Sequence, residues 1–307
     1  MAERPRGGGV PVVVLRWFQS DSRLPWVILA LMLAIGWSTS GLVFRHIEAA
    51  SAPQIIFYRG TCLTFAVISF VVWRHRFFAV RAFVSTGKAG IAGAFGLGLA
   101  SVAFISAMEH TTIANISFMI AATPFFAGGM AWLLLRETMA LRTVIATLIA
   151  MCGVLVMVGE GLALDSLHGN LLALACALLS AVYVVAARFG RGVDMVPTVA
   201  MAGMVAAGTA FLIIDSFEIS LHDFALCALQ GVFISAMCNG LFTLCARHLP
   251  AGELTVLSLL ESALSPLWVF LFLAEVPTKV TLVGGGVILS AVLIQAFWPG
   301  ASRREQN

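Results

Sequence analysis

Charged side chains are scarce in this chain of 307 residues. Asp, Glu, Lys and Arg together make up 11% of it, hydrophobic residues make up 60%, and the mean hydropathy is +1.00. A soluble domain carries about 25% charged residues and could not shield this much apolar surface from water. The composition therefore excludes an ordinary soluble protein and indicates that lipid is the solvent.

Motifs of several other protein classes are missing as well. There is no P-loop, which excludes a pump fuelled by ATP, and the six cysteines show no Cys-x-x-Cys spacing, which favours buried thiols over disulfides or a metal site. The six histidines fall at the ends of apolar segments or between them, and no Asp lies in the middle of one. We therefore expect no enzyme, no cofactor, no metal and no nucleic-acid partner.

Ten apolar segments follow one another with short links. A helix needs about 20 apolar residues to cross the hydrocarbon core of a bilayer. The predicted spans are 26–45, 54–73, 88–108, 113–134, 141–159, 169–188, 197–214, 223–246, 251–273 and 280–298. Residues 1–25 and 299–307 are the predicted tails. The pattern predicts an all-α membrane protein of ten transmembrane helices.

Lys and Arg are distributed unequally between alternate links. Fifteen of the 18 fall in the tails or in links on the N-terminal side, whereas only Arg45 and Lys279 fall on the other side and Arg59 lies within a span. Cationic residues are retained in cytoplasmic loops. Both termini are therefore predicted to be cytoplasmic, in a multi-pass protein of the plasma membrane, which for a bacterium is the inner membrane.

A weak internal repeat relates the two halves of the chain, 26–159 and 160–298. At a shift of 138 residues the coinciding pairs are Gly93 and Gly231, Phe95 and Phe233, Phe104 and Phe242, His110 and His248, and Glu137 and Glu275. Each half holds five spans, and because five is odd the halves would enter the membrane from opposite sides. Such inverted repeats place a substrate cavity between the halves and provide alternating access. The alternative is coincidence between two apolar segments.

Short motifs along the chain resemble those of the EamA-type, ten-helix branch of the drug/metabolite transporter superfamily. They are Ile35-Gly36-Trp37-Ser38, Tyr58-Arg59, Ala121-Ala122-Thr123-Pro124 with Leu135-Arg136-Glu137, and Leu259-Leu260-Glu261 with Ala274-Glu275. Within that family the chain is most similar to the YddG-type exporters, a resemblance that implies export of aromatic and other amino acids. The family often has Pro after the residue matching Glu261. Here that residue is Ser262, and Pro266 follows four positions later.

Arg59 and Glu261 are the charges placed deepest in apolar segments. A charge inside a membrane span is a functional-site hypothesis by default. Glu261 lies about ten residues, or roughly 15 Å, from the cytoplasmic end of its span, which is the bilayer centre. It either lines a cavity, attracting an ammonium group or cycling a proton, or is a structural carboxyl. Arg59 could bind a substrate carboxylate, pair with Glu261 or cap backbone carbonyls.

Other polar and aromatic residues complete the predicted wall of the substrate cavity. Ser258 and Ser262 share a helical face with Glu261, and Asn239 could bind a zwitterion or another helix. The remaining predicted substrate-binding residues are Trp37, Ser40, Met119, Thr123 and Tyr183. Trp37 and Tyr183 either stack on a substrate or fill the core. Glu137 is treated as structural, with Arg142 as its expected partner.

The function predicted from these features is secondary export of small amphipathic solutes. Amino acids, including aromatic ones, are the favoured substrates, and membrane lipids surround the protein. If Glu261 takes up and releases a proton, proton coupling follows. The alternatives are a nucleotide-sugar or phosphate-ester exchanger of the same superfamily, which would want two or more deep cations, and, less favoured, an intramembrane enzyme.

Overall fold

The computed structural model describes residues 23–158, 167–273 and 278–297, and these form helices joined by short links. The predicted tails, except for residues 23–25, lie outside the described residues, as does Glu275. Within these described ranges, eight helical stretches have the length and apolarity needed to cross a membrane, and two further apolar helices are shorter. Large apolar side chains are exposed on many of them, among them Phe65, Trp132 and Leu133. This surface fits a protein that contacts lipid.

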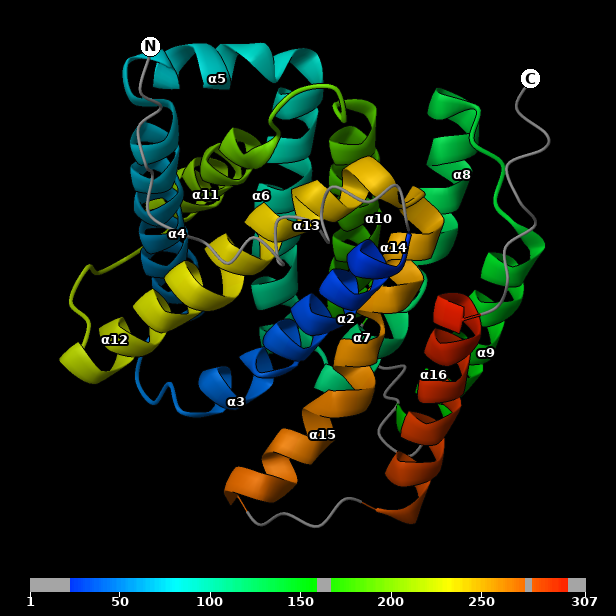
Figure 1. The fold of residues 1–307 in the computed structure, drawn as a ribbon. Coiled ribbons are helices and arrows are strands. Elements are labelled where there is room, and N and C mark those ends of the chain that lie inside the picture. The colour runs from blue at the N-terminus through cyan, green and yellow to red at the C-terminus, as the bar shows by residue number, and fades with distance from the viewer. Residues whose placement is uncertain (1–22, 159–166, 274–277, 298–307) are drawn as a thin grey trace, which may run out of the picture.

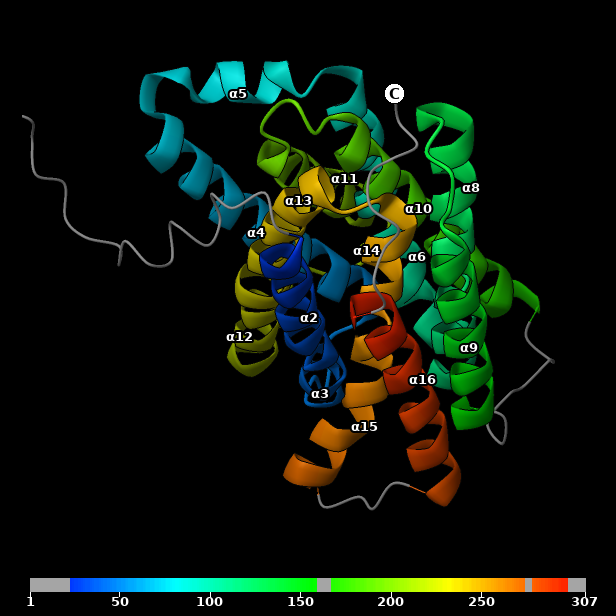
Figure 2. The ribbon, with the colours of Figure 1, turned by 45° about the vertical axis from the view of Figure 1, so that its right-hand side comes forward.

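The first repeat extends from α2 to α9 (Figure 1). Its elements are α2 (Leu24–Ser38), α3 (Ser40–Arg45), α4 (Ala52–His75), the 3-10 turn η1 (Arg76–Phe78), α5 (Ala79–Ser85), α6 (Gly87–His110), α7 (Ile113–Ile120), α8 (Thr123–Leu135) and α9 (Leu141–Val158). The predicted first span is divided at Thr39, whose hydroxyl donates to the Gly36 carbonyl at 2.7 Å. Short α5 lies across the ends of α4 and α6 (Figures 1 and 2).

The second repeat extends from α10 to α16. Its elements are α10 (Leu167–Phe189), α11 (Val196–Phe211), α12 (Leu221–Leu229), the π-helical segment η3 (Gln230–Met237), α13 (Cys238–His248), α14 (Ala251–Ser258), α15 (Leu260–Leu273) and α16 (Lys279–Phe297). The helices α12, η3 and α13 continue one another, so that a π-helical segment interrupts one long span. Such insertions widen the helix and are frequent at functional sites.

Both repeats contain one span that is broken after eight residues. Helix α7 and helix α14 are each eight residues long, and α14 begins 138 residues after α7, at 251 against 113. At each break the backbone uses hydrogen bonds from residue i to residue i−3, at 3.1 Å from Ala122 N to the Met119 carbonyl and at 3.1 Å from Leu259 N to the Val256 carbonyl. The shift of 138 residues detected in the sequence therefore also separates the starts of α7 and α14 in the structure.

Helices of the two repeats pack against each other in matched pairs. Helix α4 lies against α11, α8 against α14, and α9 against α16 (Figure 1). Glycines allow two of these contacts to be close: a Cβ on Gly60 would lie 2.9 Å from the Gly203 carbonyl, and one on Gly153 would lie 2.9 Å from the Gly284 carbonyl. Small residues bring helix backbones together in this way in membranes.

Ion pairs between the repeats join helix ends. Glu253, at the start of α14 and 2% exposed, accepts from Arg23 Nε at 2.6 Å and from Arg142 at 3.1 Å. Glu137 pairs with Arg188 at 2.9 Å and with Arg191 at 3.7 Å. The expectation that Arg142 pairs with Glu137 is therefore wrong. Packing of α10 against α8 brings Arg188 to Glu137, and Arg142 instead faces α14.

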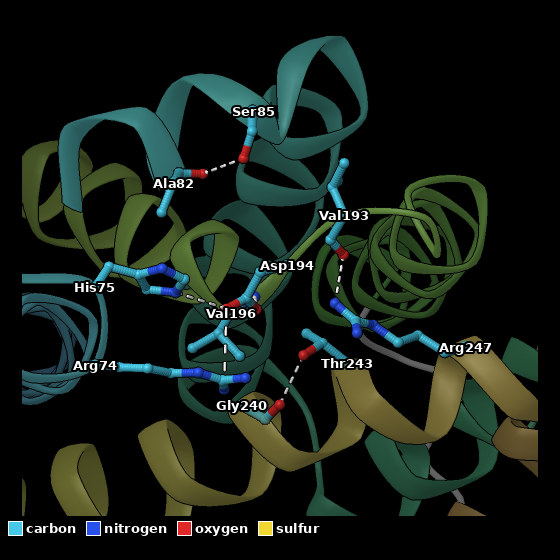
Figure 3. A network of polar contacts seen from close by, with 10 residues as sticks. All are labelled: Arg74, His75, Ala82, Ser85, Val193, Asp194, Val196, Gly240, Thr243 and Arg247. Carbon is cyan, nitrogen blue, oxygen red and sulfur yellow. Dashed lines mark hydrogen bonds and ion pairs between the residues drawn. The ribbon is translucent and has the colours of Figure 1, made fainter. Parts of the chain in front are cut away.

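A third polar cluster connects the end of α4 with the link between α10 and α11 (Figure 3). The Asp194 carboxylate lies 3.0 Å from His75 Nε2 and 3.9 Å from an Arg74 nitrogen, and it accepts from the backbone N–H of Val196 at 3.1 Å. Nearby, the Arg247 guanidinium donates to the Val193 carbonyl at 2.5 Å. These contacts hold the start of α11 beside α4.

Candidate substrate cavity

A cavity of about 270 Å³ lies between the two repeats. Its wall is formed by α2, α3, α4, α6, α7 and α8 of the first repeat and by α10, α11, η3, α13, α14 and α15 of the second. Most of the lining is apolar, with a few polar groups and two formal charges, those of Arg59 and Glu261. Small-molecule sites commonly have this character, because apolar walls enclose a ligand while a few polar groups orient it.

Arg59 is held at the wall by contacts from two neighbouring segments. Its guanidinium donates to the Ser101 hydroxyl of α6 and lies with its central carbon 6.0 Å from the centre of the Phe44 ring. A cation near the face of an aromatic ring is attracted by the ring's quadrupole. Within the described residues no ion pair joins Arg59 to Glu261, so the predicted alternative of a direct pair is not realised in this structure. Arg59 remains available to an anionic group in the cavity.

Glu261 lies in the first turn of α15, directly beyond the break at Leu259. The described part of the chain contains no hydrogen bond or ion pair to its carboxylate. A negative charge in the first turn of a helix is favoured by the helix dipole and by the free N–H groups there. The break therefore provides a place for a carboxylate at mid-span. At the matching place in the first repeat, Thr123 donates its hydroxyl to the Ile120 carbonyl at 2.6 Å.

The π-helical segment η3 contributes polar groups that a regular helix would not bring together. Gln230 donates to the Ser40 hydroxyl at 3.1 Å, Asn239 donates its amide to the Ser235 carbonyl at 2.8 Å, and Tyr183 donates to the Asn239 carbonyl at 3.0 Å. The wider turn, which holds more residues than an α-helical turn, lets Gln230, Ser235 and Asn239 all line the cavity. This wall connects α3, α10 and the long interrupted span.

Aromatic rings cover another part of the wall. Phe242 lies between Trp37, at a ring-centroid distance of 5.4 Å, and Tyr183, at 5.8 Å with the rings 22° from parallel. Phe44 and Phe104 form a second pair with centroids 6.3 Å apart. Both groups line the cavity together with the two charges. The wall therefore offers aromatic rings to the apolar part of a ligand and charged groups to its polar part.

Eight of the ten residues predicted as substrate-binding lie in the wall of this cavity. They are Trp37, Ser40, Arg59, Thr123, Tyr183, Asn239, Ser258 and Glu261. Met119 packs instead with a core cluster that contains Ala107, Ile116 and Ala173. Ser262 is not part of the wall either, because the break at Leu259 ends the single helical face on which its predicted place depended.

Several polar residues of the wall were not predicted from the sequence, notably Ser101, Ser180 and Gln230. Gln230 offered a signal, since an amide inside an apolar segment is uncommon, but its five-residue distance from Ser235 does not fit α-helical spacing. Ser101 and Ser180 offered none, because serine is common in membrane helices. Among the described residues, no group of three or more His, Cys, Asp or Glu is placed to bind a metal ion.

These features define a multi-pass membrane protein whose two repeats enclose a central cavity. The model of the EamA-like transporter family matches residues 24–159 and again residues 167–297. The chain therefore belongs to the EamA-like transporter family and contains two EamA repeats. Its members are membrane transporters of the drug/metabolite superfamily, a class of carriers rather than of enzymes.

Comparison with individual known proteins adds a likeness of fold. No curated protein matches the chain. A solved structure, described only as "Crystal structure of protein", superposes with a TM-score of 0.74 at 18% identity, and the alignment covers 89% of this chain and 98% of that one. This likeness extends over nearly the whole of both chains and supports the fold.

Proposed function

We propose that this protein exports amino acids, including aromatic ones, across the inner membrane of a bacterium. One observation carries the proposal: a carboxylate and a guanidinium line the same cavity without pairing with each other in the described structure. A zwitterion presents the two complementary charges. Its carboxylate can bind Arg59, which also has the Ser101 hydroxyl beside it, and its ammonium group can bind Glu261.

The aromatic rings support the choice of side chain. Trp37, Phe242 and Tyr183 offer flat apolar surfaces beside the charged groups, and aromatic rings prefer stacked or tilted partners at such distances. A phosphate ester fits less well, because Arg59 is the only cation among the lining residues of the described structure. Phosphate recognition in the nucleotide-sugar or phosphate-ester exchanger would need more donors.

The transport mechanism we propose is alternating access between inverted repeats, with ten spans and both termini in the cytoplasm. The equal offset of the broken helices and the matched pairs α4–α11, α8–α14 and α9–α16 support this relation. Two halves that pack through equivalent helices can exchange their packing around a central site. The repeats would occupy residues 26–159 and 160–298.

Contacts at the helix ends that we assign to the cytoplasm support a state closed on that side. Glu253 connects α14 to Arg23 and Arg142 of the first repeat. The Met139 side chain fills the space between α8 and α14, since a Cβ on Gly128 would lie 2.7 Å from its Cε and one on Gly252 would lie 2.9 Å from it. Opening this side requires these contacts to separate.

Vesicles reconstituted with the protein test the substrate class. We expect labelled phenylalanine and tryptophan to be transported, and excess unlabelled amino acid to compete. Their methyl esters and N-acetyl derivatives, which each lack one of the two charges, should compete at least roughly tenfold less well, since each forfeits one charge-assisted contact. Equal competition by inorganic phosphate or by a sugar phosphate would favour the exchanger. Runs with and without a pH gradient show whether a proton is coupled.

Topology is tested separately with a thiol probe that does not cross membranes. Glu218→Cys should react with the probe added outside intact cells, whereas Arg191→Cys should react only after the membrane is permeabilised. Both positions are exposed in the structure. The reverse pattern would overturn the proposed orientation, whatever the substrate proves to be.

A further inference from the structure

The segment from Arg76 to Lys88, which we call the interfacial segment, differs from the rest of the helical bundle. It contains η1 and α5 and the first residues of α6, and α5 runs across the ends of α4 and α6 rather than along them (Figures 1 and 2). Only a few of its residues, such as Ala82 and Thr86, are buried. A short helix that lies crosswise at the end of a membrane bundle occupies the level of the headgroups.

Apolar side chains on this segment face outward. Phe77 is 99% exposed, and Phe78, Val80 and Val84 are 67%, 75% and 73% exposed. In water such a group of side chains would be unfavourable, since it leaves large apolar area uncovered. At the boundary between headgroups and acyl chains the same side chains enter the apolar layer. Their exposure therefore indicates a lipid surface as the partner.

The exposed charges of the interfacial segment all have one sign. Arg76, Arg81 and Lys88 are exposed, and the sequence has no acidic residue between Glu48 and Glu109. The acidic group of the adjoining cluster, Asp194, is occupied by contacts with Arg74, His75 and the Val196 N–H (Figure 3). Within the described residues, no ion pair engages the three cations of the interfacial segment.

We propose that the interfacial segment binds the headgroups of anionic phospholipids in the cytoplasmic leaflet. Arg76, Arg81 and Lys88 contact the phosphates while the neighbouring Phe and Val side chains enter the acyl layer. Basic residues next to a membrane are attracted to anionic lipid, each by about fivefold in binding at low ionic strength. The choice of leaflet rests on the orientation given under the proposed function, whereas the lipid preference does not depend on the transported substrate.

Native mass spectrometry of the purified protein tests the proposal. Protein in neutral detergent is titrated with phosphatidylglycerol or with phosphatidylcholine, and the apparent dissociation constant of the first bound lipid is measured. We expect tighter binding of phosphatidylglycerol, and a loss of about twentyfold in that preference in the double variant Arg81→Gln/Lys88→Gln. Inorganic phosphate at equal concentration should not compete, since it has no acyl chains.

Two control variants make the result specific. Arg136→Gln removes an exposed Arg at the end of α8, away from the interfacial segment, and should leave the lipid preference unchanged. The exchange Arg81→Lys/Lys88→Arg keeps both charges and should retain it. An unchanged preference in the double Gln variant, or an equal loss in Arg136→Gln, would overturn the proposal. Neither result would affect the vesicle assay, so this test and that of the proposed function fail independently.

Discussion

The two broken spans, α7 with α8 and α14 with α15, have the same layout but different chemistry. Their first segments have equal length, and both breaks are followed by the residue that enters the cavity wall, Thr123 in one repeat and Glu261 in the other. Near the start of the first segments the counterparts are Asn115 and Glu253, and both are buried. The repeats thus share a backbone plan, while both carboxylates belong to the second repeat.

Because of this difference, two repeats with the same backbone layout stabilise the two ends of the cavity by different interactions. Asn115 donates to Thr111 and Asn170 through neutral hydrogen bonds of 2.9 Å, whereas Glu253 forms two charged contacts. Neutral bonds inside a protein contribute less than buried ion pairs lose when one partner is removed. The two ends of the cavity are therefore secured with unequal strength, although the backbone that surrounds them is nearly equivalent.

The largest effect is expected at the break itself. Glu261→Gln keeps the shape of the side chain but removes the negative charge that we propose binds the substrate ammonium group. It should lower the initial rate of amino-acid export by roughly tenfold or more. Thr123→Val, at the matching position, should lower it by less than about threefold, because the Thr123 hydroxyl is used within its own helix. Export into reconstituted vesicles measures both.

A carboxylate outside the cavity serves as the control for that experiment. Glu137→Gln should reduce the yield of folded protein, since Arg188 and Arg191 lose their partner, yet the protein that folds should transport at a rate close to wild type. If Glu261→Gln transported at the unchanged rate, the role of Glu261 in binding would be wrong.

The next largest effect is expected on stability, from changes to the buried polar residues near the starts of α7 and α14. Glu253→Gln should lower the free energy of unfolding by about 3 kcal/mol, because two arginines then face a neutral amide in a largely buried place. Asn115→Ala should lower it by about 1 kcal/mol, the value of ordinary neutral hydrogen bonds. Thermal unfolding in detergent ranks the stability of the two variants, and equal losses would show that Asn115 and Glu253 stabilise the two ends of the cavity equally.

The smallest effect is expected from exchanging the residues that follow Thr123 and Glu261. Ser262→Pro would remove the 3.1 Å bond from Ser262 N to the Leu259 carbonyl, which is worth about 1 kcal/mol, and would keep the break. Pro124→Ala should likewise keep it, since the second repeat breaks with Ser at that place. Export rates of both variants should stay within about twofold of wild type, as expected for the loss of at most one such bond. A far larger loss would show that Pro and Ser define different geometries.

The sequence allowed the apolar segments and the shift of 138 to be predicted because both depend on local composition. The broken helices begin at residues that obey this shift, 113 and 251, as do α9 and α16 at 141 and 279. Arg59 and Glu261 could be selected because a charge is conspicuous in an apolar segment. These features need no knowledge of how the helices pack.

Features that depend on packing between distant helices could not be predicted in this way. The sequence offered Arg142 as the partner of Glu137 because it is near in the chain, whereas the fold brings in Arg188 from α10. The π-helical segment changes the direction in which Gln230 points, and the break at Leu259 interrupts the helical spacing that placed Ser262 on one face with Ser258. Helical spacing assumes an unbroken α-helix, and the cavity is built where that assumption fails.

The reciprocal contact of Gly153 with Gly284 has a mechanical consequence. With no side chain between them, α9 and α16 touch backbone to backbone: a Cβ on Gly284 would lie 2.5 Å from the Gly153 carbonyl. Two rods in such contact can pivot about the point where they meet but cannot draw closer. In the alternating-access mechanism that we propose, this crossing would be the pivot of the two repeats, with α9 and α16 staying in contact while the cavity opens on one side or the other.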